Sequence, residues 1–446
     1  MAKLAYRGGR RIRSKPFMAW PEYDSREERY LLQTLRSRNW GGFPSPNEKA
    51  AELAARFAAA HDARYGVCAA NGTVTLELAL KAGGLIAGDE VITTPYTWVA
   101  TAAAPVTVNL VPVFVDVDPD TYCIDPALIE DAITPRTRAI ICVHLGSTIC
   151  DLDALKRIAK KHKLVLIEDC AHAHGSQWKG KGVGSHGDFG SFSFQSSKLM
   201  TAGEGGLVTT NKKHYEMLLQ SLANCGRKEP GYDSYSGRVL GWNYRLADLQ
   251  AAVLLAQLDR LAKVTAKRQK NARYLTRQLD EIEGITTLKR DRRITTSAHY
   301  QYIFKYDPRG FKGLHRDDFL TALSAEGVDM DGDFYVPVYE SDLFAVSALD
   351  WPMIKKRYGD AIPGSRKLPK CPVATKAAYE EACWLHYPAL MGTRKDVDDV
   401  VAAIRKVQDN VDQILPRKLD GKPHLPKSGG LRARAAQKKK PKKSKK

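Results

Sequence analysis

One lysine, Lys198, lies in a segment that is otherwise apolar or rich in serine, threonine and glycine. The segment reads GSFSFQSSKLMTAGEGGLVTTN over residues 190–211, so two phenylalanines precede the lysine and a GEGG turn follows it. A lysine held among apolar neighbours has a lowered pKa and can form a Schiff base with an aldehyde. Lys198 is therefore a candidate nucleophile, although a lysine taken alone is more often a solvated surface charge.

A carboxylate ends the apolar run that precedes this segment. Residues 164–169 read LVLIED, and Asp169 is the last of them. Burying a carboxylate at the end of a strand is costly, so we expect a cationic partner beside it. His172 and His174 follow within one turn, and carboxylates with histidines can bind zinc. The sequence contains no HExxH motif and no cysteine pair at metal-site spacing, so we expect no metal.

Two further motifs could hold a flat, phosphorylated ligand. NGTVTLELALKAGG (71–84) opens an amphipathic helix, and a helix N-terminus offers free N–H groups and a positive dipole end to a phosphate. In PYTWVATA (95–102), Trp98 follows a predicted strand, where an aromatic ring can cover a flat ligand. Taken singly, an ordinary helix cap and a core tryptophan explain these residues equally well.

Together the motifs fit one ligand, a phosphorylated pyridine that bears an aldehyde, which is pyridoxal 5'-phosphate. Lys198 would hold the aldehyde, and Asp169 would pair with the pyridinium nitrogen and make the ring an electron sink. Trp98 would stack on the ring. Three residues would hold the phosphate: Gly72, Thr73 and Ser193.

The elements that must position these residues alternate between strand and helix. Short apolar runs predict strands over 90–94, 111–117, 138–145 and 164–169. DLDALKRIAKKHK (151–163) has apolar residues at helical spacing. This alternation favours an α/β fold with a parallel sheet covered on both faces, and such sheets bind ligands at the carboxyl ends of their strands.

The length of 446 residues favours more than one domain. We expect a large ligand-binding domain over 41–259 and a smaller α+β domain over 260–416, with residues 1–40 packing against the smaller one. The last 30 residues contain 13 Lys or Arg and a single acid, out of a net charge of +19 for the chain. We expect a disordered basic tail over 417–446, which could contact nucleic acid by charge alone.

Other features restrict the location of the protein. No run of about 18 apolar residues predicts a membrane-spanning helix, and the basic N-terminus lacks the apolar stretch of a secretory signal. The eight cysteines are scattered, which is typical of reduced thiols in a cytoplasmic protein.

As a set, these motifs resemble the DegT/DnrJ/StrS family of fold-type I pyridoxal-phosphate enzymes, the sugar and aminocyclitol aminotransferases. The similarity covers about residues 4–411 and rests on NGTVTLELAL, GDEVITTPYTWVATA, IEDCAHAHGS, GSFSFQSSKLMTAGEGG and GWNYRLADLQAA. The resemblance implies a mostly parallel seven-stranded sheet between helices and supports the roles given above. It also implies that His172 lies near the cofactor's phenolic oxygen. It further implies that Asn243 reaches the phosphate of a neighbouring subunit, in a homodimer with shared active sites.

The resemblance implies an aminotransferase that moves an amino group from glutamate or glutamine to a keto-cyclitol or a nucleotide-linked keto-sugar. FQSSK replaces the frequent FHPTK form and resembles the branch with aminocyclitol transaminases and aminohydroxybenzoate synthases. The aromatic-rich segment 331–351 is expected to shape the acceptor site. Two alternatives remain: a sugar dehydratase of the same family, which Lys198 disfavours because that branch has histidine there, and a nucleic-acid-binding or regulatory protein that acts through its tail.

Overall fold

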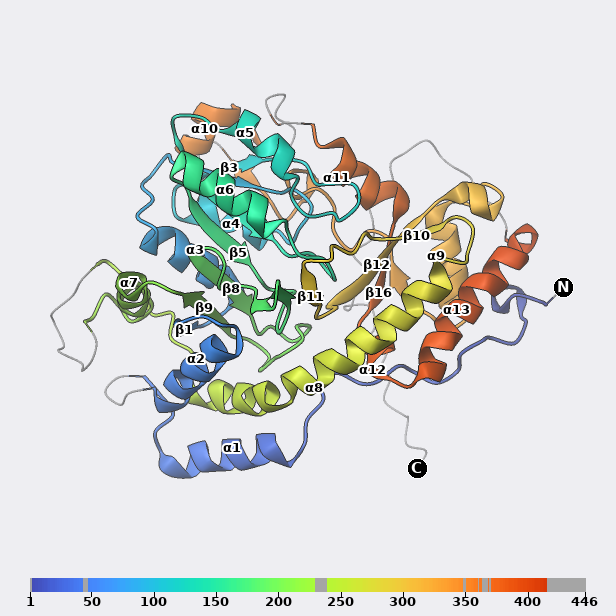
Figure 1. Ribbon diagram of the computed structural model, residues 1–446, viewed down its shortest axis with the longest axis horizontal. Coiled ribbons are helices and arrows are strands. Elements are labelled where there is room, and N and C mark those ends of the chain that lie inside the picture. The colour runs from blue at the N-terminus through green and yellow to red at the C-terminus, as the bar shows by residue number, and fades with distance from the viewer. Residues whose placement is uncertain are drawn as a thin grey trace, which may run out of the picture.

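The computed structural model describes residues 2–42, 47–228, 239–347, 350–359, 361–362, 368 and 370–414. A seven-stranded sheet forms the centre of the larger part (Figure 1). Its order is β1 (Tyr65–Ala69), β9 (Gly206–Thr210), β8 (Phe189–Ser193), β5 (Val165–Asp169), β4 (Thr137–Val143), β2 (Glu90–Thr93) and β3 (Val111–Phe114). Only β9 runs antiparallel to its two neighbours, β1 and β8. The prediction of a mostly parallel seven-stranded sheet is confirmed.

The sheet is buried on both faces, as the continuous apolar runs predict. Successive residues of one strand enter different cores: Ile140 packs in one hydrophobic cluster and Ile141 in another. The first core includes residues of α2 (Glu48–Ala60), α6 (Leu152–His162) and the long α8 (Asp248–Leu279). The second includes residues of α3 (Gly72–Ala82) and α7 (Lys213–Ala223). Helices therefore cover both faces and leave the strand ends for the site.

A second, antiparallel sheet lies at the other end of the molecule (Figure 1). Its order is β10 (Ile285–Thr287), β12 (Gln301–Tyr306), β16 (Ala382–His386) and β13 (Met330–Asp331). It packs with α9 (Arg316–Ala325) and α13 (Arg394–Asp409) in a separate core, which Leu4 of the N-terminal segment joins.

Helix α8 connects the two parts without interruption. Leu254 in its first half belongs to the core of the large sheet, and Leu275 in its second half belongs to the core of the small one. The boundary that we expected at residue 259 therefore falls inside a continuous helix and not in a linker.

The remaining elements are short or peripheral. Helix α1 (Ser25–Ser37) begins with a capping box at Asp24 and packs against α8. The other helices are α4 (Ala100–Thr107), α5 (Ile129–Ala132), α10 (Pro352–Tyr358), α11 (Pro372–Lys376) and α12 (Pro388–Met391). The other strands are β6 (Gln177–Trp178), β7 (Lys181–Gly182), β11 (Ile294–Thr296), β14 (Val346–Ser347) and β15 (Ala361–Ile362). Among the described residues, no helix combines the length and the apolar character that crossing a membrane requires.

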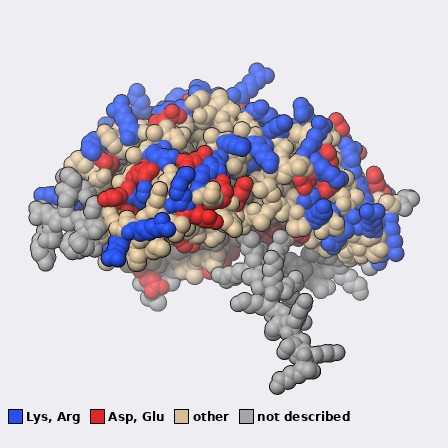
Figure 2. Space-filling view, turned by 90° about the horizontal axis from the view of Figure 1, so that it is seen from below, with Lys and Arg blue, Asp and Glu red and all other residues tan. Residues whose placement is uncertain are grey.

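Basic and acidic side chains lie side by side on the face seen in Figure 2. Around α2 and α8, for example, Arg56 forms ion pairs with Glu52 and Asp259. Pairs of this kind neutralise one another and add little to stability. The basic tail over 417–446, and with it the expected contact to nucleic acid, lies outside the described residues.

Candidate active site

Lys198 lies in the turn that follows β8, at the carboxyl edge of the large sheet. Its backbone N–H donates to the carbonyl of Gln195 at 2.8 Å, and its Nζ lies 4.6 Å from the ring centroid of Tyr300. Ser197 Oγ contacts both Gln195 Oε1 at 2.8 Å and Tyr300 Oη at 2.9 Å. These contacts fix the turn just before the lysine, and the amine is held against an aromatic face.

Asp169 is the last residue of β5, which runs parallel to β8 and pairs with it. Its carboxylate accepts hydrogen bonds from Thr101 Oγ1 at 2.9 Å and from the Ala171 N–H at 3.2 Å. Burial raises the pKa of Asp169, although these two hydrogen bonds and the charge of Lys198 oppose that rise. The site therefore contains a buried carboxylate that a cationic ligand atom would stabilise.

The N-terminus of α3 lies directly against the end of β8. Asn71 caps the helix by accepting from the Val74 N–H at 3.0 Å, which leaves the N–H groups of Gly72 and Thr73 without partners inside the helix. A Cβ atom added at Gly72 would lie 2.5 Å from Ser193 Cβ, a separation that real atoms do not show. Only glycine permits this approach, which brings two N–H groups and a serine hydroxyl together as an anion cradle.

His172 is the centre of a group of rings beside Lys198. Its imidazole stacks on Tyr300 with a centroid distance of 4.1 Å, and its Nε2 lies 3.1 Å from Tyr335 Oη. Burial and the charge of Lys198 hold the pKa of His172 well below its usual value. The ring is therefore neutral at physiological pH. His174 instead packs among Phe57, Phe192 and Phe194 in the core.

Trp98 and Asn243 are the two expected site residues that lie at the surface. Trp98 precedes α4 and is 51% exposed. Asn243 is exposed and pairs with Asn224 in an isolated bridge, and its neighbours Leu240 and Trp242 are also exposed. Neither shares a recorded contact with Lys198 or Asp169.

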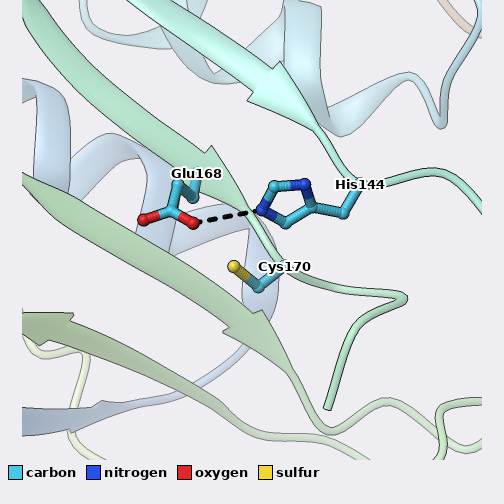
Figure 3. A group of neighbouring side chains, drawn as sticks. All are labelled: His144, Glu168 and Cys170. Atoms are coloured by element: carbon cyan, nitrogen blue, oxygen red, sulfur yellow. Dashed lines mark hydrogen bonds and ion pairs between the residues drawn. The ribbon is translucent and has the colours of Figure 1, made fainter. Parts of the chain in front are cut away.

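A buried group of His144, Glu168 and Cys170 has the composition of a metal site (Figure 3). The Glu168 carboxylate accepts from His144 Nε2 at 3.1 Å and from the N–H groups of three residues, at 2.8, 2.8 and 2.7 Å: Gly184, His186 and Gly187. His144 Nδ1 accepts from the Cys150 N–H at 3.2 Å, so Nε2 carries the proton that Glu168 accepts. Both partners are therefore satisfied by the protein. The His144–Glu168 hydrogen bond joins the residue that follows β4 to β5, next to Asp169.

These residues match the chemistry of pyridoxal phosphate. The Gly72–Ser193 approach provides a cradle of phosphate-binding groups, Asp169 provides a buried carboxylate for a protonated ring nitrogen, and Lys198 provides an amine. The model of the DegT/DnrJ/EryC1/StrS aminotransferase family matches residues 21–405. This chain belongs to that family. It is a pyridoxal-phosphate-dependent aminotransferase of the fold-type I class.

Individual relatives agree with this assignment. A protein of Streptoalloteichus tenebrarius, provisionally named L-glutamine:3-amino-2,3-dideoxy-scyllo-inosose aminotransferase, is 49% identical over 416 residues, which are 93% of this chain and 99% of that protein. The L-glutamine:scyllo-inosose aminotransferase of Streptomyces griseus is 37% identical, over 93% of this chain and 99% of its own. The crystal structure of 3-amino-5-hydroxybenzoic acid synthase superposes with a TM-score of 0.76 at 32% identity, over 90% of this chain and 100% of that one.

Sequence reasoning missed three residues of this aminotransferase that the structure places at the site. Thr101 lies inside the PYTWVATA motif, but nothing local showed that its hydroxyl would reach Asp169, 68 positions away. Tyr300 directly precedes β12 of the smaller sheet, and Tyr335 lies in the loop that follows β13. The prediction that segment 331–351 contributes to the acceptor site was the one signal that pointed towards Tyr335.

Proposed function

We propose that this aminotransferase takes its amino group from glutamine and delivers it to a keto-cyclitol. The names of the most similar relatives support both halves of the proposal, since they specify L-glutamine as donor and an inosose as acceptor. The FQSSK segment around Lys198 supports the same branch of the family. Of the two acceptors expected from the sequence, we therefore favour the keto-cyclitol over the nucleotide-linked keto-sugar.

Lys198, Asp169 and the Gly72 cradle carry the proposed mechanism. When bound, pyridoxal phosphate supplies the aldehyde that takes up the amino group and a ring that accepts an electron pair. Gly72, Thr73 and Ser193 would hold the phosphate, through two N–H groups and one hydroxyl. Asp169 would keep the proton on the ring nitrogen, because its buried carboxylate would gain stability from that positive charge.

Lys198 moves the proton in each half of the reaction. With its amine free, Lys198 Nζ would act as general base on the α-carbon proton of glutamine and then give that proton up as general acid. In the second half Lys198 would move a proton in the opposite direction, to the carbon that carried the ketone. Glutamine thus leaves as its keto acid, and the ketone leaves as an amine. Trp98 would cover the cofactor ring, and His172 would contact its phenolic oxygen.

The proposal includes a homodimer with shared sites. Asn243 is exposed, and its neighbours Leu240 and Trp242 are 85% and 57% exposed. Exposed apolar side chains of this kind favour a partner surface. Asn243 would then reach the phosphate in the partner's site. All eight cysteines are free, which supports a reducing, cytoplasmic location.

A visible absorption spectrum of the loaded enzyme tests the function. Glutamine alone should remove the band of the lysine-bound cofactor, and subsequent addition of 2-deoxy-scyllo-inosose or scyllo-inosose should restore it. Lys198→Ala protein should show no such band. A band that glutamine leaves unchanged would contradict glutamine as donor, and a bleached band that neither ketone restores would contradict the acceptor class.

A mixed dimer tests the shared site separately. Lys198→Ala and Asn243→Ala chains each damage a different half of a shared site, so co-expression should yield one intact site per mixed dimer. Recovery of activity above both parents supports sharing. Mixed dimers that are no more active than the Asn243→Ala parent would show that each site is built from one chain.

A further inference from the structure

Tyr335 carries a buried hydroxyl group that the proposed mechanism does not yet use. The residue follows β13 of the small sheet and is only 7% exposed. Its ring packs against those of Tyr96, Phe334 and Trp384, with centroid distances of 6.5, 4.8 and 5.5 Å. The phenol is thus held firmly, with its Oη 3.1 Å from His172 Nε2.

The direction of that hydrogen bond follows from the other side of the imidazole. The Gly146 N–H donates to His172 Nδ1 at 3.3 Å, so Nδ1 has no proton. The ring is neutral because burial and the charge of Lys198 lower its pKa, so its one proton sits on Nε2. Nε2 therefore donates and Tyr335 Oη accepts. In the opposite tautomer, the Nδ1–H of His172 and the N–H of Gly146 would face each other, and neither would have an acceptor there.

In this arrangement the Tyr335 oxygen accepts, so the proton of its hydroxyl is not donated to His172. Within the part of the chain that the structure describes, the only hydrogen bond recorded for this oxygen is the one with His172. Burial, Tyr300 and the charge of Asp169 raise the pKa of Tyr335 well above its usual value, so the hydroxyl keeps its proton. A buried O–H without an acceptor is costly, and such groups in native proteins normally have a partner.

Tyr335 also lies beside the reacting lysine. His172 joins it to Tyr300 by stacking at 4.1 Å, and Tyr300 is the ring that Lys198 Nζ contacts at 4.6 Å. The charge of Asp169 is near enough to act on the phenol. A ligand that reacts at Lys198 would therefore lie close to the Tyr335 hydroxyl.

We propose that Tyr335, held by His172, donates its hydroxyl proton to an oxygen of the keto acceptor close to the reacting carbon, and so orients this substrate. The inference rests on the proposed function and adds a specificity-determining residue to it. A protonated phenol hydroxyl is a hydrogen-bond donor, and a keto-cyclitol offers it carbonyl and hydroxyl oxygens as acceptors. A carboxylate of glutamine would instead meet the negative field of Asp169 at this place.

The test compares Tyr335→Phe with Tyr306→Phe in the loaded full-length enzyme. Tyr306 in β12 is also buried, at 3% exposed, but its hydroxyl donates to the carbonyl of Leu314 at 2.8 Å in the separate core of the small sheet. Stopped-flow absorbance follows the two half-reactions separately, with glutamine for the first and 2-deoxy-scyllo-inosose or scyllo-inosose for the second. Tyr335→Phe should lower kcat/KM of the acceptor half about tenfold, as expected for one lost hydrogen bond, and leave the glutamine half within about twofold. Tyr306→Phe should leave both halves unchanged.

The glutamine half-reaction also reports that the Tyr335→Phe protein is folded and loaded. Equal slowing of both halves, together with a shifted pH midpoint of the visible band, would overturn the inference and show that the phenol acts on the cofactor. No change in either half would overturn it as well. If the wild-type enzyme completes the glutamine half but no ketone completes the second, the proposed acceptor class fails, and this inference fails with it.

Discussion

Replacing Thr101 by valine removes the hydroxyl that donates to Asp169 Oδ2 at 2.9 Å and keeps a side chain of nearly the same shape. Thr101 is 1% exposed and Asp169 is 6% exposed, so water cannot replace the lost donor. A hydrogen bond to a buried charged group contributes about 1.5–3 kcal/mol. Because one pKa unit corresponds to about 1.36 kcal/mol, the pKa of Asp169 should rise by about one to two units further.

The consequence should appear on the acidic side of the pH profile. Asp169 must be ionised to hold the proton on the ring nitrogen, so a higher pKa moves the acidic limb upward by about one to two pH units. The assay is the rate of the glutamine half-reaction from about pH 5 to about pH 9. Thr107→Val is the matched control, because Thr107 in the same helix also donates to a carboxylate, Glu77 Oε1 at 2.7 Å, away from the site. An acidic limb that stays in place would refute the assigned role of Thr101.

Two further predictions test the cradle and the buried carboxylate. Gly72→Ala places a Cβ 2.5 Å from Ser193 Cβ and should lower cofactor affinity by about tenfold or more, with a loss of about 1–3 kcal/mol in the free energy of unfolding. Gly83→Ala is the control, at the other end of α3 with φ −69° and its nearest atoms at 3.2 Å. It should change neither cofactor affinity, measured by fluorescence titration, nor the free energy of unfolding, measured in urea. Equal effects of the two substitutions would count against the cradle. In the cofactor-free protein, the raised pKa of Asp169 gives stability that is present below the usual carboxyl pKa and is lost as the pH rises through the raised value. Asp169→Asn cannot ionise, so the cofactor-free variant should melt above the wild type near pH 7 and alongside it in acid, and identical melting curves at both pH values would contradict this.

Local pattern determined which residues lie at the edge of the sheet. The run LVLIED is long enough for one buried strand, so Asp169 had to end it, and the structure ends β5 at that residue. NGTVTLELAL placed Gly72 at a helix start for the same reason, since side-chain periodicity and capping act within a few residues. The alternation of strands and helices then limited the fold to a parallel sheet with its ligand at the carboxyl ends.

Tertiary packing decided which groups surround these residues. Tyr300 reaches Lys198 across about a hundred positions, Tyr335 reaches His172 across 163, and Thr101 reaches Asp169 across 68. No periodicity links such pairs. Thr101 meets Asp169 through packing within the larger part, whereas Tyr300 and Tyr335 meet their partners only where the smaller part packs against it. Even a known contact between His172 and Tyr335 would not give the direction of their hydrogen bond. That direction depends on the Gly146 N–H on the opposite side of the ring. Local pattern was enough to predict the strand ends and the chemical groups they carry. Their partners come from distant segments, and such contacts form through packing and not through local pattern.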